Sequence, residues 1–267
     1  MAYAEWGDPA NRSVVVCVHG LTRSGRDFDT LARALAPRHR VVCPDIVGRG
    51  RSDWLPDFRG YGFAQYVGDC VTLLARLNVS DVIWVGTSMG GLIGLMIAAL
   101  DGAPLRRFVI NDVGPVIGAR GLARIGDAVG AKSRFASFQE GVDHIASISA
   151  TFGPHTPEQW RELNRHIVVP ADGGWGLHYD PKIADAAKAD IARPAPVADL
   201  WPLWDRVRCP TLVLRGADSD LLEAEVAAAM LRRGPPASLI EYPGVGHAPT
   251  LMQPDQVRDV VAFIDRS

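Results

Sequence analysis

The sequence lacks the features that mark membrane-spanning and nucleic-acid-binding proteins. Its 267 residues contain no long uninterrupted apolar run, and the apolar run after Ser88 is short and broken by glycine. We therefore expect no membrane span. The charges are spread out and sum to −2, so no basic stretch suggests contact with nucleic acid. The sequence also has no repeat or low-complexity segment, and it does not fix the oligomeric state.

Cysteine is scarce. The four cysteines stand at positions 17, 43, 70 and 209, and none forms a C-x-x-C pair or a Cys/His cluster, so the sequence predicts no metal or redox site. The N-terminus lacks the basic start and apolar centre of a secretory signal. We therefore expect reduced, buried thiols in a cytoplasmic protein.

Strand and helix patterns alternate from residue 2 to about 112 and again from Thr211 onward. This alternation predicts an α/β fold with a mostly parallel sheet covered by helices on both faces, and 48% hydrophobic content supplies ample core. Between Gly114 and about Leu200 we find no convincing strand, only helix-like stretches such as 138–152 and 157–168. The interruption predicts a helical insertion above the strand ends, where ligands of such sheets bind.

The most informative stretch is Gly86-Thr87-Ser88-Met89-Gly90, which reads G-x-S-x-G. A β-branched run typical of a buried strand precedes it (81–85), and an apolar run typical of a buried helix follows (91–100). A serine at a sharp strand-to-helix turn projects its hydroxyl above the sheet, where it can attack a carbonyl. A glycine-rich turn whose serine only caps the helix is the alternative.

A serine hydroxyl needs a base, and His247 is our candidate. It lies in a Gly/Pro loop between a predicted strand (238–242) and the last predicted helix (254–265), where an imidazole can reach a distant strand end. His39 lies in a polar connection, where we expect a solvated side chain. The four histidines of the middle region are expected to have surface or core roles, and they are His144, His155, His166 and His178.

The base in turn needs a carboxylate to fix its tautomer. Asp218 and Asp220 follow the predicted strand that begins at Thr211, and Asp112 follows the strand that ends at Asn111. All three satisfy the chain order Ser, Asp, His that is expected in this kind of sheet. Spacing alone does not choose among them.

Taken together, these motifs resemble those of the α/β-hydrolase superfamily over nearly the whole chain. The matching segments are, in chain order, His19-Gly20 after a strand, the glycine loop 45–53, the turn around Ser88, and His247 in its loop. The segments 111–115 and 175–181 are similar to those of a bacterial subgroup known only as hydrolases or esterases. In that subgroup R-G-x-x-S-D-L-L follows the penultimate strand, and the match at 215–222 implies that the triad acid is Asp220.

The resemblance also implies an oxyanion hole made by the backbone N–H groups of Leu21 and Met89. His19 is then a structural residue that holds its loop. The implied architecture is an α/β-hydrolase core (1–113 and 201–267) with a helical cap (114–200). The N-terminal strand corresponds to the family's second strand, which leaves open whether a first strand precedes it.

From these residues we expect a serine hydrolase that cleaves carboxylic esters of small molecules through an acyl-enzyme, without cofactor or metal. Alternatives on the same scaffold are a carbon–carbon bond hydrolase, a lactonase, a thioesterase and a cofactor-free perhydrolase or haloperoxidase. Among the cap tryptophans we expect Trp175 to line the pocket, with ordinary packing as the alternative. Arg49 or Arg51 in the glycine loop is a candidate for meeting a substrate carboxylate, with pairing to a nearby aspartate as the alternative.

Overall fold

The computed structural model describes residues 1–130, 132–191 and 199–266. Within these residues seven strands form one sheet, and all neighbouring pairs are parallel except the first, in which β1 runs antiparallel to β3. The mostly parallel sheet predicted from the sequence is therefore confirmed. In spatial order the strands are β1 (Tyr3–Trp6), β3 (Arg40–Pro44), β2 (Val14–Val18), β4 (Val82–Thr87), β5 (Leu105–Asn111), β9 (Thr211–Gly216) and β10 (Ala237–Tyr242).

Helices cover both faces of this sheet, as predicted, because successive strand residues point to opposite sides. Val14, Val16 and Val18 of β2 pack in one apolar cluster, whereas Val15 and Cys17 pack in the other. The first cluster holds side chains from α2 (Phe63–Leu77), α3 (Met89–Ala98), α8 (Trp201–Trp204) and α9 (Ala224–Met230). The second holds side chains from α1 (Asp29–Leu35) and α10 (Pro254–Ile264), with the short 3₁₀ helix η1 (Gly25–Phe28).

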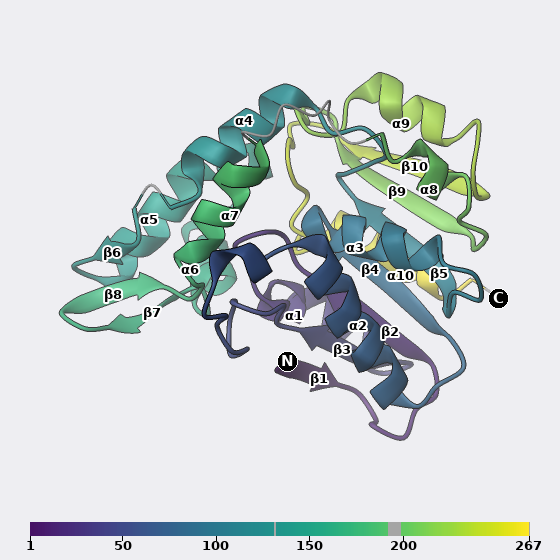
Figure 1. Ribbon diagram of the computed structural model, residues 1–267, viewed down its shortest axis with the longest axis horizontal. Coiled ribbons are helices and arrows are strands. Elements are labelled where there is room, and N and C mark those ends of the chain that lie inside the picture. Colours follow the sequence, from purple (N-terminus) through teal and green to yellow (C-terminus); the bar gives the residue numbers. More distant parts are fainter. Residues whose placement is uncertain (131, 192–198, 267) are drawn as a thin grey trace.

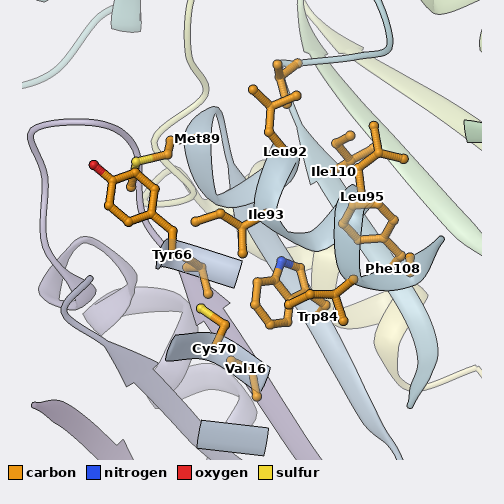
Figure 2. Packing of buried hydrophobic residues seen from close by; sticks show 14 of the residues in the cluster. Val16, Tyr66, Cys70, Trp84, Met89, Leu92, Ile93, Leu95, Phe108 and Ile110 are labelled. Atoms are coloured by element: carbon orange, nitrogen blue, oxygen red, sulfur yellow. The ribbon is translucent and has the colours of Figure 1, made fainter. Parts of the chain in front are cut away.

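The strand β4 that leads to Ser88 lies in the middle of the core. Figure 2 shows its Trp84 among Val16, Ile93 and Phe108, all of them fully buried. The Trp84 indole N–H donates to the backbone oxygen of Gly90, 3.0 Å away. This contact joins the strand to the first turn of α3, so the core fixes the turn between them.

Residues 114–200 separate β5 from α8, and their described elements project from one end of the sheet, drawn in teal and green in Figure 1. The predicted helices are present over α5 and α6, but the expectation of no strand in this segment is wrong. A three-stranded antiparallel sheet lies there, in the order β6-β8-β7. The elements are α4 (Ala119–Ala128), β6 (Arg134–Phe135), α5 (Phe138–Ile148), η3 (Ala150–Phe152), α6 (Pro157–Asn164), β7 (Val168–Ala171), β8 (Gly174–Leu177) and α7 (Lys182–Ile191).

The sequence analysis missed these strands for a local reason. Ala171 pairs with Gly174, so Asp172-Gly173 is a two-residue hairpin loop, and Gly173 takes the positive φ of 76° that such turns require. An Asp-Gly pair between apolar residues is a strong hairpin signal, but here Pro170 and Gly174 lower the strand propensity of the flanks.

The inserted segment is tied to the core through the glycine loop that follows β3 and runs toward η2 (Phe58–Gly60). The N–H of Gly50 donates to His178 O at 2.9 Å, and the N–H of Asp180 donates to Gly48 O at 2.8 Å. The buried Asp180 also accepts a hydrogen bond from Tyr61 Oη at 2.6 Å. None of the helices in the described residues is both long enough and apolar enough to cross a membrane.

Candidate active site

Ser88 occupies a strained turn between β4 and α3. Its backbone has φ 52° and ψ −116°, a region that side chains with a Cβ rarely adopt. The turn is tight because a Cβ at Gly86 would lie 2.2 Å from Gly90 O, and one at Gly90 would lie 2.0 Å from Val18 O. The glycines of the motif therefore let the helix start directly against the strand ends, which is what exposes the hydroxyl of Ser88.

His247 reaches Ser88 from the loop after β10. Its Nε2 lies 2.9 Å from Ser88 Oγ, and its Nδ1 lies 2.8 Å from Asp112 Oδ2. The inserted segment helps to hold this loop, because Thr151 Oγ1 donates to the backbone oxygen of His247 at 2.7 Å. The structure therefore brings Ser88 and His247 together, across 159 residues of sequence.

The carboxylate that faces the imidazole is Asp112 and not Asp220, so the predicted pairing of Asp220 with His247 is wrong. Asp112 is fully buried, and its backbone has a positive φ of 56°. Its Oδ1 accepts from the N–H of Gly216 at 2.8 Å, and its Oδ2 accepts from Ser219 Oγ at 2.7 Å as well as facing His247. These donors fix the orientation of the carboxylate that in turn orients the ring.

Asp220 has no hydrogen bond to His247 and instead forms a two-pronged ion pair with Arg124 of α4, with N–O distances of 2.8 and 2.7 Å. The hydrogen bond from Arg124 lowers the pKa of Asp220, against the opposing effect of its partial burial. Asp218 is exposed, and its backbone N–H donates to Val245 O. Within the 215–222 motif, Ser219 is the residue that reaches the site, because the turn after β9 directs its hydroxyl at Asp112.

His19 is buried beneath the loop that carries Leu21. Its Nδ1 donates to Gly20 O at 2.7 Å, and its Nε2 accepts from the N–H of Ile46 at 3.0 Å. Accepting that bond requires a neutral ring, and burial lowers the pKa of His19 to about 4. His19 thus orients the Gly20–Leu21 peptide group, whose N–H is one of the two proposed oxyanion donors.

The second candidate donor is the N–H of Met89, the first residue of α3. No backbone acceptor for the N–H of Leu21 or of Met89 is present in the described part of the chain. Leu21 lines both cavities that open at Ser88, and Met89 lines one of them. They are therefore free to donate to a ligand at the serine.

Arg49 and Arg51 do not meet a ligand space. Arg49 is fully buried, and it donates through Nε to Leu21 O and through Nη1 to Val47 O, both at 2.8 Å. Its guanidinium lies 4.8 Å from the ring centre of Tyr66. Arg51 donates to Tyr3 O at 3.0 Å on the surface. Arg49 instead holds the loop through the backbone oxygen of Leu21, and His19 holds the same loop through the backbone oxygen of Gly20. The sequence analysis did not predict this role of Arg49.

Two cavities meet at Ser88. The first, which we call the imidazole-side cavity, is lined by His247 together with charged and apolar side chains of the inserted segment. The second, which we call the apolar cavity, is lined by Met89, Leu92 and other apolar side chains and by no charged residue. Leu21, Ser88 and Ile125 border both.

Trp175, expected in the pocket, lines neither cavity. It packs against Phe138, with ring centres 5.4 Å apart, in a small cluster with Ile145, Ile167 and Val168. The hairpin that the sequence analysis missed places it there, because β8 turns the indole toward α5. The expectation that His39 is solvated is also wrong.

His39 is buried and lies between Ser13 Oγ at 2.9 Å and Asp265 Oδ1 at 2.8 Å. This second Ser–His–Asp chain lines neither of the two cavities. Its serine has no strained turn, since φ is not positive at Ser13. Of these two hydrogen-bonded chains in the described residues, the one at Ser88 is the one that borders the two cavities.

Comparison with known proteins finds relatives that match most of this chain. The sequence pattern of the "Alpha/beta hydrolase family" matches residues 15–260. A "3-hydroxybutyrate-oligomer hydrolase" of Cupriavidus necator is 54% identical over 263 residues, which cover 96% of this chain and 90% of that protein. The crystal structure of an alpha/beta hydrolase from Novosphingobium aromaticivorans is 37% identical with a TM-score of 0.90, covering 99% of this chain and 93% of that one. A "2-(acetamidomethylene)succinate hydrolase" of Mesorhizobium japonicum is 28% identical and covers 92% of this chain and 86% of its own length.

Proposed function

The chain is a hydrolase of the alpha/beta hydrolase family, and on that premise we propose that it cleaves carboxylic esters with a Ser88–His247–Asp112 triad. The hydrogen-bonded chain from Ser88 Oγ through the imidazole to the buried Asp112 carries this proposal. A nucleophile, a base and a group that orients the base are the three parts that acyl transfer by serine requires.

In the first half of the reaction His247 Nε2 takes the Ser88 proton as Oγ attacks the ester carbonyl. The negative oxygen of the tetrahedral intermediate accepts hydrogen bonds from the N–H groups of Leu21 and Met89. Each such donor is worth about 3 kcal/mol of transition-state stabilisation. His19 and Arg49 hold the Leu21 loop before substrate arrives, so little reorganisation is needed during the reaction.

In the second half the imidazolium gives its proton to the departing alcohol, and Ser88 keeps the acyl group as an ester. Water then enters beside His247. The imidazole removes a proton from this water as the water oxygen attacks the acyl carbon. The acid leaves, and Ser88 regains its proton. Asp112 stays ionised throughout and stabilises the imidazolium.

For the substrate we propose short oligomers of 3-hydroxy acids such as 3-hydroxybutyrate. The support is the 54% identity to the Cupriavidus necator hydrolase, which extends over nearly the whole of this chain. An oligoester has a hydroxy-acid unit on each side of the ester bond, and Ser88 lies between two cavities. A small-molecule ester is in any case the partner that this site fits.

We propose that residues 114–200 act as a cap on a core formed by residues 1–113 and 201–267. Arg124, Ile145 and Leu163 of this segment line the imidazole-side cavity, so the segment shapes the space above the serine.

We also propose a cytoplasmic location, because all four cysteines are free thiols. Cell fractionation tests this location.

The test is hydrolysis of the 3-hydroxybutyrate dimer and of p-nitrophenyl butyrate by the wild type and by Ser88→Ala. We expect the wild type to cleave both esters and Ser88→Ala to cleave neither, with an unchanged circular dichroism spectrum. Unchanged turnover in the folded variant would disprove the serine mechanism. If the wild type cleaves the p-nitrophenyl ester but not the dimer, the proposed esterase activity stands and the proposed substrate is wrong.

A further inference from the structure

The two cavities at Ser88 differ in their relation to the base. His247 lines the imidazole-side cavity and does not line the apolar cavity, whereas Met89 lines only the apolar cavity. In ester cleavage the departing oxygen receives its proton from the imidazolium, so this oxygen must lie beside His247 Nε2. We therefore expect the alcohol part of the ester to extend into the imidazole-side cavity and the acyl part to extend into the apolar cavity.

The charged side chains of the imidazole-side cavity differ in how fully they are used. Arg23 has an acceptor on each of its three nitrogens: Nε and Nη2 bind Asp27, and Nη1 donates to Asn164 Oδ1 at 2.8 Å. Lys132 is half-exposed and lies 2.7 Å from Glu140 Oε1. Neither side chain has a nitrogen without an acceptor among the described residues.

Arg124 differs from both. Asp220 binds its Nε and Nη2, which fixes the plane of the guanidinium. Its Nη1 has no acceptor among the residues that the structure describes, and the side chain lines the cavity and is 31% exposed. A guanidinium held on one edge and open on the other has the fork geometry that binds a carboxylate.

We propose that Arg124 binds the carboxylate of the hydroxy-acid leaving group, with Asp220 as the residue that positions Arg124. This inference rests on the proposed ester hydrolysis and adds a direction to it. The substrate lies with its free-acid end in the imidazole-side cavity, and the enzyme removes hydroxy-acid units that carry an ionised carboxyl group. The bond that breaks joins the acyl carbon to the oxygen of this unit, which leaves as a hydroxy acid after taking the proton of the imidazolium.

The experiment compares two substrates that differ only at this end: the 3-hydroxybutyrate dimer with a free carboxylate, and the same dimer as its terminal primary amide. The amide has nearly the same shape but no charge. For the wild type we expect kcat/KM about tenfold higher for the acid, with the difference mainly in KM. For Arg124→Gln we expect the acid-to-amide ratio to fall to about one.

Arg120→Gln is the matched control, because Arg120 lies on the same helix α4, is exposed, and lines neither cavity. It removes the same charge from the protein, and we expect it to keep the ratio of the wild type. The double variant Arg124→Gln/Asp220→Asn removes both charges of the pair. We also expect its acid-to-amide ratio of kcat/KM to be near one. That result would exclude repulsion between an unpaired Asp220 and the substrate carboxylate as the cause of the loss in Arg124→Gln.

Three results would overturn the proposal. These are a wild-type ratio near one, a wild-type ratio retained by Arg124→Gln, and an equal loss in Arg120→Gln. Should Arg124→Gln fail to fold, Arg124→Lys replaces it, with an expected ratio between those of the wild type and the double variant. In all these cases the esterase stands if p-nitrophenyl butyrate is cleaved in a Ser88-dependent manner. Loss of that activity in the wild type would instead remove the proposed function itself.

Discussion

The three aspartates near His247 give the sharpest test of the catalytic geometry. Asp112→Asn keeps the size of the side chain but replaces one carboxylate oxygen by an NH₂ group. Gly216 N–H donates to Asp112 Oδ1 and cannot accept, so the amide oxygen is needed at that position, and the NH₂ group takes the place of Oδ2, to which Ser219 Oγ–H donates in the wild type. The NH₂ group then faces His247 Nδ1, which must accept. The ring proton moves to Nε2, and the imidazole can no longer take the proton of Ser88.

A wrong tautomer of this kind lowers kcat by about 10⁴-fold, which corresponds to about 5 kcal/mol of transition-state stabilisation. Asp220→Asn removes only a partly exposed ion pair with Arg124, and such pairs are worth about 0–1 kcal/mol. We therefore expect a loss of less than about tenfold with p-nitrophenyl butyrate, which has no carboxylate for Arg124. Asp218→Asn changes an exposed residue and serves as the matched control.

The assay is steady-state hydrolysis of p-nitrophenyl butyrate at neutral pH, with unfolding by denaturant to show that each variant is folded. The expected order of kcat is Asp218→Asn close to wild type, Asp220→Asn slightly lower, and Asp112→Asn lower by orders of magnitude. A folded Asp220→Asn enzyme as inactive as Asp112→Asn would refute the assignment of the acid.

Three further predictions concern residues outside the triad. Burial holds the His19 pKa at about 4, below the 6.5 of the unfolded chain, so His19 stabilises the fold fully above pH 6.5 and loses this effect as the pH falls toward 4. When the pH falls from 7.5 to 5, the unfolding free energy of the wild type should therefore decrease by about 2 kcal/mol more than that of His19→Gln, as measured by urea unfolding. Equal decreases in the two proteins would argue against a buried neutral ring. Gly90→Ala should cost about 3 kcal/mol or prevent folding, because its Cβ meets Val18 O, and a melting temperature equal to that of the wild type would contradict this. Trp175→Ala should cost about 2 kcal/mol of stability but leave KM for p-nitrophenyl butyrate unchanged, because the indole packs against Phe138 outside both cavities. A large rise in KM would show that Trp175 contributes to the substrate pocket.

Local sequence was sufficient for the strand, turn and helix around Ser88. Strand propensity, two glycines and an apolar helix act within some 20 residues, so neighbouring residues suffice to predict the backbone there. The same holds for the loop position of His247 and for the alternation that predicts a parallel sheet. The strands of the inserted segment were missed because Pro170 and Gly174 weaken a short hairpin whose stability comes from packing on α5.

The identity of the carboxylate depended on tertiary structure. Strands β5 and β9 are about 100 residues apart in sequence but adjacent in the sheet, so Asp112 and Asp220 both follow strands that end at the same edge. A left-handed backbone at Asp112 aims its carboxylate at the imidazole, while the turn after β9 sends Ser219 inward and Asp220 outward to Arg124. Sequence determined which side chains reach this edge of the sheet. Only the packing of the two strands and their turns decided which one meets His247, because side-chain direction there depends on backbone angles set by distant contacts.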